Sequence, residues 1–424
     1  MSLAPLRILV VLPMYGGSLS IGHYCATALG GMGHVVKVFD ATLLYPAFTG
    51  LRALGLPQAA TSQLENAFLH VVAQAIWAQV QSLEPHLVLA AAQAPLGRGL
   101  LQRLRRSNVR TAMWFVEDHE IFSYWRSYAP LYDVFAVIQK EPFLSKLAAL
   151  GQHNVLYLPL AALPEVHRPL DLTQQERREY GADIGFMGAG YPNRRLAFRQ
   201  LAGRDFKIWG SDWEDEPLLV SHVQRAGARI SSEESVKIYN ATRINLNLHS
   251  SMQTRDLVSH GDFVNPRTFE LAAIGAFQLV DERSLLPELF AKDELATFAT
   301  LEEMFAAIDH YLACPEERRA IAQRARAKAL REHTYAARMT ALLDFIQERM
   351  GAWPQDQRRE ESLPEELSPQ LRDSLDRLLR TLGLGPHAHF DEVIQALRAR
   401  SGVLSDVEAT LLFLDEWRKQ YARK

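Results

Sequence analysis

The feature that most constrains the fold is an alternation of short apolar runs with helical stretches, which stops at a proline-rich segment and then starts again. Alternation of this kind favours a parallel sheet covered by helices on both faces. In the first part of the chain, strands are predicted over 7–12, 35–39, 86–91, 111–115, 134–138 and 155–158, and helices over 18–31 and 61–83.

Residues 161–181 interrupt this alternation. They carry Pro164 and Pro169, followed by a polar run, so we predict a linker with a single surface helical turn. The alternation restarts with predicted strands over 183–187, 206–209, 244–248 and 277–280, and helices dominate from residue 301 onward. The predicted organisation is a domain over 1–160, a second domain over 182–335 and a closing helix over 336–353.

The C-terminal segment 363–424 is predicted to be a third, helical unit. Its apolar spacing indicates amphipathic helices over 369–382, 390–399 and 405–421. About sixty residues are marginal for independent stability, so their apolar faces must pack on something. We expect self-association through these helices, with packing on the main body as the alternative.

Composition excludes several classes of protein. A net charge of −3 gives no general reason to expect nucleic acid as a partner, and no apolar run approaches membrane-spanning length. The 14 histidines are scattered, and no H-E-x-x-H or C-x-x-C motif is present, so no metal site is predicted. The two cysteines, the absence of a signal peptide and the strand at the N-terminus lead us to expect a cytoplasmic protein.

A candidate anion site lies in the second half. Pro266 suits the first turn of a helix that ends at Gly275, and an apolar strand follows directly. Free N–H groups and the dipole at such a helix start favour phosphate. Arg267 can reinforce the phosphate and Glu270 can accept hydrogen bonds from a sugar diol. The alternative is an ordinary amphipathic helix with a solvated Glu and Arg.

A second glycine-rich turn precedes two arginines. Gly188 and Gly190 follow the predicted strand 183–187, and Arg194 and Arg195 come directly after. Such a turn can bring backbone N–H groups and a guanidinium onto a diphosphate. The alternative is a solvated arginine pair on a surface helix.

Two loops of the first domain can face the acceptor. Asp118 and His119 lie at the end of a predicted strand, where either can act as a general base or orient a hydroxyl, although Asp118 can also simply cap a helix. Gly16 and Gly17 form the turn after the first strand and permit close approach of a ligand, or merely a tight turn. His23 is a further candidate on the following helix.

These residues resemble a known family. Residues 265–275 look like the R-x-F-E-x-x-A-x-G signature of GT-B glycosyltransferases of the CgeB-like (spore maturation) group, and 186–194 are similar to its F-x-G-x-x-Y-x-x-R segment. Residues 114–118, 132–135 and 156–162 match the N-terminal pattern of the family, and 315–319 and 333–335 match its usual ending. The resemblance covers about residues 5–350 and not the C-terminal tail.

The resemblance implies an α/β protein with two facing Rossmann-like domains, here with a C-terminal helical appendage. It also implies a nucleotide-sugar donor in the second domain, an acceptor in the first, and no bound metal. Related retaining enzymes use an E-x7-E motif; Glu270 matches its second position, and the shorter Asp262 stands at the first. Asn265, with Gly188, Gly190 and the arginines, completes the expected donor site.

We therefore expect a glycosyltransferase that moves a sugar from a nucleotide-sugar donor to an unidentified acceptor, such as a protein or a glycan. Two alternatives remain at this stage. One is a nucleotide-sugar epimerase or hydrolase of the same fold, and the other is a protein that binds a sugar nucleotide or a partner without turnover.

Overall fold

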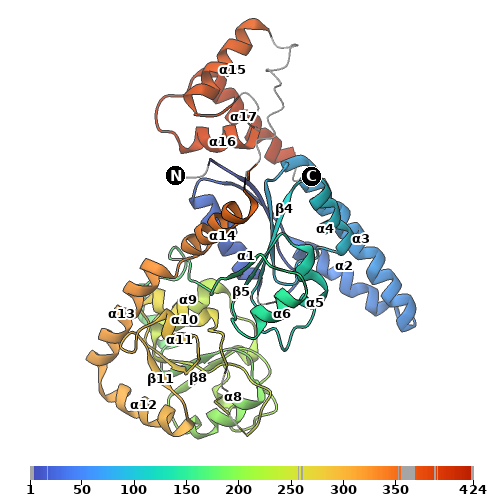
Figure 1. Cartoon of the computed structure of the whole chain (residues 1–424). Coiled ribbons are helices and arrows are strands. Elements are labelled where there is room, and N and C mark those ends of the chain that lie inside the picture. Colours follow the sequence, from blue (N-terminus) through green and yellow to red (C-terminus); the bar gives the residue numbers. More distant parts are fainter. Residues whose placement is uncertain are drawn as a thin grey trace.

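The computed structural model describes residues 4–16, 18–255, 257–258, 261–351, 353–354, 368–385, 388 and 390–421. It consists of two α/β units and a small helical unit at the C-terminal end (Figure 1). The first sheet has the strand order β2-β1-β3-β4-β5-β6 and the second has the order β11-β10-β9-β7-β8. All neighbouring strands in these two sheets are parallel. The predicted fold class, with two Rossmann-like units and a helical appendage, is confirmed.

The first sheet is buried on both faces. Along β1, Ile8 and Val10 face one hydrophobic core and Leu9 and Val11 face the other, as the two-residue period of a strand requires. A strand of this kind is apolar throughout, which is why it is recognisable in the sequence. The strands are β1 Arg7–Val11, β2 Val35–Phe39, β3 Leu87–Ala91, β4 Arg110–Phe115, β5 Val134–Val137 and β6 Val155–Tyr157.

Helices cover both faces of this sheet. The predicted helix 18–31 is observed as α1 with the same bounds, and the long predicted helix begins three residues earlier than expected, as α3 Gln58–Leu83. The remaining helices of this unit are α2 Tyr45–Gly50, α4 Arg98–Arg106, α5 Trp125–Tyr128 and α6 Phe143–Ala149, with 3-10 turns at Ala41–Leu44, Leu51–Leu54 and Ala129–Leu131.

The second unit follows the linker. The predicted surface turn is α7 Gln174–Tyr180, which starts with a capping box between Thr173 and Glu176. The strands are β7 Ala182–Met187, β8 Phe206–Trp209, β9 Thr242–Asn247, β10 Gln278–Asp281 and β11 Ala296–Phe298. The α-helices are α8 Pro192–Ala197, α9 Ser232–Ala241, α10 Pro266–Ile274, α11 Leu286–Leu289, α12 Leu301–Ala313 and α13 Pro315–Glu332, and short 3-10 segments lie at Phe198–Leu201, Val220–His222 and Gln224–Gly227.

Helix α14 (Tyr335–Met350) carries the chain back from the second unit onto α1 of the first. The Arg338 guanidinium donates to the carbonyls of Pro159 and Leu160, at the end of the first unit. The apolar face of α14, whose side chains include Met339 and Leu342, is buried in the core that runs through both units. Each fully buried side chain of this size contributes about 1.5–3 kcal/mol, so α14 is a strong link between the units.

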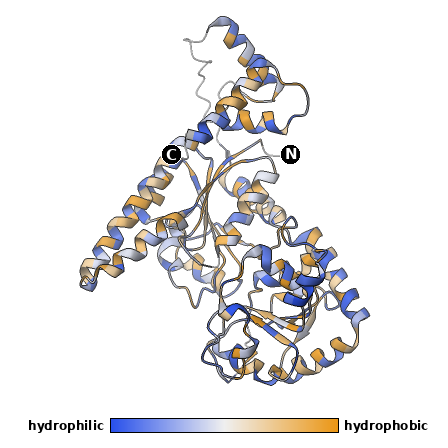
Figure 2. Ribbon diagram, turned by 180° about the vertical axis from the view of Figure 1, so that it is seen from behind, coloured by the Kyte–Doolittle hydropathy of each residue, from blue (hydrophilic) through white to orange (hydrophobic). Residues whose placement is uncertain are grey.

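The C-terminal helices are α15 Pro369–Thr381, α16 Phe390–Ala399 and α17 Asp406–Tyr421, close to the predicted ranges. They share a small apolar core of their own. They also contact the first unit, because Arg7 pairs with Glu392 at 3.0 Å and the Gln395 amide donates to the His34 carbonyl. Figure 2 shows that most helices carry both hydrophobic and hydrophilic residues, as expected for helices with one buried face. No helix in the described part of the chain is long and apolar enough to cross a membrane.

Candidate active site

The candidate site lies where the strand order of each sheet reverses. The first strand of each unit, β1 or β7, has the next strand in sequence on one side and a later strand on the other. Ligands of open α/β sheets bind beyond the carboxyl ends of the strands at such points. Gly16 follows β1 with a φ of 107°, and the Ser18 hydroxyl at the start of α1 donates to the Ala92 carbonyl after β3. Gly17 lies outside the described residues.

The start of α10 is held by side chains from the neighbouring strands. Asn265 caps the helix, accepting from the Thr268 N–H at 3.1 Å, and its amide donates to Asn247 at the end of β9 at 2.7 Å. Pro266 is in the first turn, as predicted, and Gly275 ends the helix in the left-handed conformation with a φ of 74°. Asn265 therefore orients the helix N-terminus, and the first turn of α10 provides N–H groups suited to an anion.

A buried pair, His249 and Asp281, supports this helix start. His249 Nδ1 lies 2.6 Å from the Asp281 carboxylate, and its Nε2 accepts from the Asn265 backbone N–H at 3.0 Å. The imidazole therefore carries its proton on Nδ1, and burial lowers its pKa. Burial opposes ionisation of Asp281, but His249 and Arg283 outweigh it and hold the pKa of that carboxyl below its usual value. His249 is thus a buried polar residue with both ring nitrogens in hydrogen bonds.

Two arginines converge on the ring of Phe186. The guanidinium carbons of Arg194 and Arg267 lie 5.0 and 5.7 Å from its centroid. Arg194 is buried and donates to the carbonyls of Leu248 and Ala189, while Arg267 Nε donates to the Tyr239 hydroxyl. Burial, with the nearby Arg267 charge, lowers the pKa of Arg194 to about 9. Neither arginine forms an ion pair with any described residue, so their positive charge is not balanced by a direct carboxylate partner.

Gly188 and Gly190, the two glycines before α8, are required by different neighbours. A Cβ on Gly188 would lie 3.2 Å from the Phe186 ring and 3.3 Å from Arg194 Nη1, so this glycine leaves room for both the ring and the guanidinium. A Cβ on Gly190 would lie 2.0 Å from the Asp212 carbonyl oxygen, a distance that no side chain can occupy. Arg195 is not brought to the Phe186 group. It pairs with the exposed Asp215 at 2.9 Å.

Glu270 lies on α10 toward the first unit. Its side chain is 19% exposed and makes no hydrogen bond with a described residue, the nearest partner being His167 Nε2 at 3.8 Å. His167 Nδ1 accepts from the Leu163 N–H, so the Nε2–H is directed at Glu270, and burial lowers the pKa of this imidazole. Tyr24 of α1 packs edge-on against His167 with the ring centroids 5.1 Å apart. A half-buried carboxylate with unused acceptor capacity therefore lies between the two units.

A chain of hydrogen bonds crosses between the units. Gln139 donates to Asp262 at 2.8 Å and accepts from both the backbone N–H and Nδ1 of His119. The other ring nitrogen of His119 lies 3.1 Å from Lys146 Nζ, and the ring stacks on Phe143. His119 is buried with both ring nitrogens occupied. It therefore orients Gln139, and through it Asp262, rather than offering a free nitrogen.

Asp118 is partly exposed. Its carboxylate accepts from the Glu120 N–H in a tight turn, and its charge acts on Arg283 of the second unit. Asp118 therefore caps a turn, and not a helix as the sequence alternative proposed. His23 lies on the exposed face of α1, whereas its neighbour Tyr24 faces His167.

Sequence reasoning missed Tyr24, His167, Gln139, Arg283 and a buried acid, Glu117. Burial raises the pKa of Glu117, which accepts from the Tyr124 hydroxyl at 2.8 Å and from the Gln93 amide. Glu117 directly precedes the predicted site residue Asp118, but its burial could not be predicted from the sequence pattern. For the others, the signal lies in contacts between distant parts of the chain.

Two parallel sheets that face each other across carboxyl-end loops define the GT-B class, and solved structures of that class share this architecture. Sucrose-phosphate synthase from Thermosynechococcus elongatus has 13% identity and a TM-score of 0.54, over 81% of this chain and 99% of that structure. Anabaena Alr3699/HepE, solved in complex with UDP and glucose, has 12% identity and a TM-score of 0.53, also over 81% and 99%.

Sequence comparison narrows the class. Residues 194–344 match a family described as glycosyl transferase-like. The chain is 24% identical over 251 residues to the spore protein CgeB of Bacillus subtilis (strain 168). The aligned region covers 57% of this chain and 76% of CgeB. The chain therefore has the GT-B fold and is similar to the CgeB-like glycosyltransferases, as its sequence motifs predict.

Proposed function

We propose that this protein transfers a sugar from a nucleotide-diphosphate donor, bound in the crevice between the two units, to an acceptor held by the first unit. The observation that carries the proposal is the arginine pair on Phe186. Two neighbouring guanidiniums without a carboxylate partner among the described residues repel each other, and a diphosphate would relieve that repulsion. Charge-assisted bonds from arginine to phosphate are among the strongest hydrogen bonds in proteins.

Glu270 is suited to the ribose of the donor. A carboxylate accepts hydrogen bonds from a vicinal diol, and the Glu270 oxygens have no hydrogen-bond donor among the described residues. The Alr3699/HepE structures contain UDP and UDP-glucose, which supports UDP as the first nucleotide to test.

The chemical step would depend on stabilising the charge that develops on the leaving diphosphate. The N-terminus of α10 together with Arg194 and Arg267 supplies positive potential without a metal ion. On the acceptor side, the partly exposed Asp118 can contact a hydroxyl. His119 acts as a positioning residue, because Gln139 and Lys146 occupy its ring nitrogens. Gly16 leaves open space beside its backbone, where an acceptor can approach.

A release assay tests the proposal. The purified full-length protein is incubated with UDP-glucose and other nucleotide sugars, in the presence of a chelator, and free nucleoside diphosphate is measured. Slow release without acceptor, and faster release with the correct acceptor, is the expected result. A donor whose binding raises the melting temperature identifies the substrate class first, because a ligand of the folded state alone stabilises it.

The same experiment separates the alternatives. Binding without release or sugar conversion would indicate a protein that only recognises sugar nucleotides. Conversion of the sugar while it remains attached to the nucleotide would indicate an epimerase. Self-association through the C-terminal helices remains a separate proposal, and light scattering of the full chain against a version ending at Gly351 tests it.

A further inference from the structure

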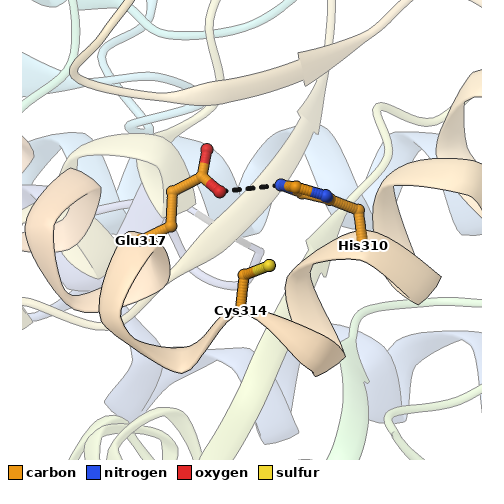
Figure 3. A group of neighbouring side chains, drawn as sticks. All are labelled: His310, Cys314 and Glu317. Carbon is orange, nitrogen blue, oxygen red and sulfur yellow. Dashed lines mark hydrogen bonds and ion pairs between the residues drawn. The ribbon is translucent and has the colours of Figure 1, made fainter.

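A group of potential metal ligands lies at the corner between α12 and α13, away from the candidate active site (Figure 3). His310 is in the last turn of α12, Cys314 is the residue between the helices, and Glu317 is in the first turn of α13. The ligand atoms of all three lie within 4.8 Å of one another. Among the residues that the structure describes, it is the one group of at least three His, Cys, Asp or Glu side chains whose ligand atoms all lie this close together.

The corner that carries these residues is rigid. The Cys314 N–H donates to the His310 carbonyl, and the Arg318 N–H donates to the Cys314 carbonyl, so α13 starts directly where α12 ends. The Arg318 guanidinium donates to the carbonyls of Tyr311 and Leu312. Because backbone and side-chain bonds hold the corner, the three ligands are brought together before any ion arrives, which lowers the entropic cost of binding.

The three side chains are also accessible. His310 Nε2 lies 2.7 Å from the Glu317 carboxylate, both side chains are about half exposed, and Cys314 is partly exposed. An imidazole nitrogen, a thiolate and a carboxylate oxygen are the ligand types that zinc prefers, and three protein ligands plus water complete a tetrahedral site.

We propose that His310, Cys314 and Glu317 bind a zinc ion, or another thiophilic divalent cation, with water as the fourth ligand. Zinc bonds of about 2.0–2.3 Å imply ligand atoms roughly 3.3–3.8 Å apart. The contact between His310 and Glu317 therefore opens by somewhat more than half an ångström, and the metal replaces that hydrogen bond. The Cys314 thiol releases its proton to solvent as the metal–sulfur bond forms.

The position of the corner indicates that this ion serves structure or regulation rather than sugar transfer. Arg318 interacts with Asp183 and Arg243, which lie at the amino ends of β7 and β9. The donor crevice is at the carboxyl ends of the same strands. The ion would cross-link α12 and α13. Helix α13 also packs against α10.

Thiol labelling provides a specific test because the chain has two cysteines. Cys25 is buried at 3% exposure, and burial raises the pKa of its thiol. A thiol reagent applied to the folded, untagged, full-length protein therefore labels Cys314 selectively. The labelling rate is measured against zinc concentration. In parallel, cobalt(II) is added and the near-ultraviolet sulfur-to-cobalt charge-transfer band is recorded.

The expected result is zinc-dependent protection of Cys314 and a cobalt–sulfur band that Cys314→Ser abolishes. Glu317→Gln and His310→Ala should each raise the zinc concentration needed for half protection by at least about tenfold. Glu316→Gln is the matched control, since Glu316 is the exposed neighbour of Glu317 and pairs with Arg319 instead; it should leave protection unchanged.

Three outcomes would overturn the proposal: no protection by zinc, no cobalt–sulfur band, or equal protection in Glu317→Gln and Glu316→Gln. Any of them would mean that His310 and Glu317 form only a metal-free contact across the corner. Far-ultraviolet circular dichroism of each variant shows whether a loss of zinc protection reflects unfolding. If it does, the milder His310→Gln variant is used instead, and a cobalt–sulfur band equal to that of the wild type would overturn the proposal.

Discussion

Replacing Arg267 tests the donor site most directly. Its Nε donates to Tyr239, and its terminal nitrogens make no hydrogen bond or ion pair with a described residue. If they bind the donor diphosphate, Arg267→Ala removes charge-assisted hydrogen bonds worth about 1.5–3 kcal/mol. This corresponds to a roughly 12- to 150-fold weaker affinity for UDP. Affinity for uridine, which has no phosphate, should change little.

The structure also predicts a small effect of this change on stability. The lost hydrogen bond to Tyr239 costs about 0.5–1.5 kcal/mol, while relief of the repulsion with the buried Arg194 acts in the opposite direction. The melting temperature of the empty protein should therefore stay close to that of the wild type. This separates Arg267 from Arg194, whose removal would leave the carbonyls of Leu248 and Ala189 without their donor.

Calorimetric titration of UDP and uridine into the wild type and two variants is the measurement. Arg195→Ala is the matched control, because Arg195 is adjacent to the site but pairs with the exposed Asp215. It should weaken UDP binding less than about threefold. The reasoning is refuted if Arg267→Ala weakens UDP and uridine equally, or if the two variants lose the same affinity for UDP.

Three further predictions follow from single positions. Glu270→Gln should weaken nucleotide and nucleoside binding alike, by about 1.5–3 kcal/mol, because the ribose is common to both; unchanged uridine affinity in a titration would remove Glu270 from the site. Gly190→Ala should lower the free energy of unfolding by about 1–3 kcal/mol in denaturant titrations, since its Cβ would overlap the Asp212 carbonyl, whereas Gly203→Ala, with open space around it, should not. Burial lowers the pKa of His333 to about 4, so the unfolded chain takes up a proton at this position before the folded protein does. Stability should therefore be full above about pH 6.5 and fall by about 2 kcal/mol by pH 5, and His333→Gln should flatten that part of the profile.

Short-range signals in the sequence were sufficient to predict most strands of the two sheets. The apolar run of β1 is buried on both faces, and so it needs no partner to be recognised as a strand. Pro266 and Gly275 marked the two ends of α10, because a proline in the first turn and a glycine in the left-handed conformation after the last turn are both local signals. The three-residue strand β11 was missed, since it is too short to show a period.

Only the tertiary structure decided which partner each side chain of the site contacts and whether it is buried. Arg194 and Arg195 are equivalent in the sequence, yet one is buried against the Leu248 carbonyl and the other pairs with an exposed acid. Asp262 meets Gln139, which is 123 residues away, and it does so only because the two units face each other. Local sequence determines backbone conformation through interactions within a few residues, whereas hydrogen-bond partners and burial depend on which surfaces the folded chain brings together. The motifs could therefore indicate a donor site, but only the packing of the two units distinguishes the residues that support it from those left available to a ligand.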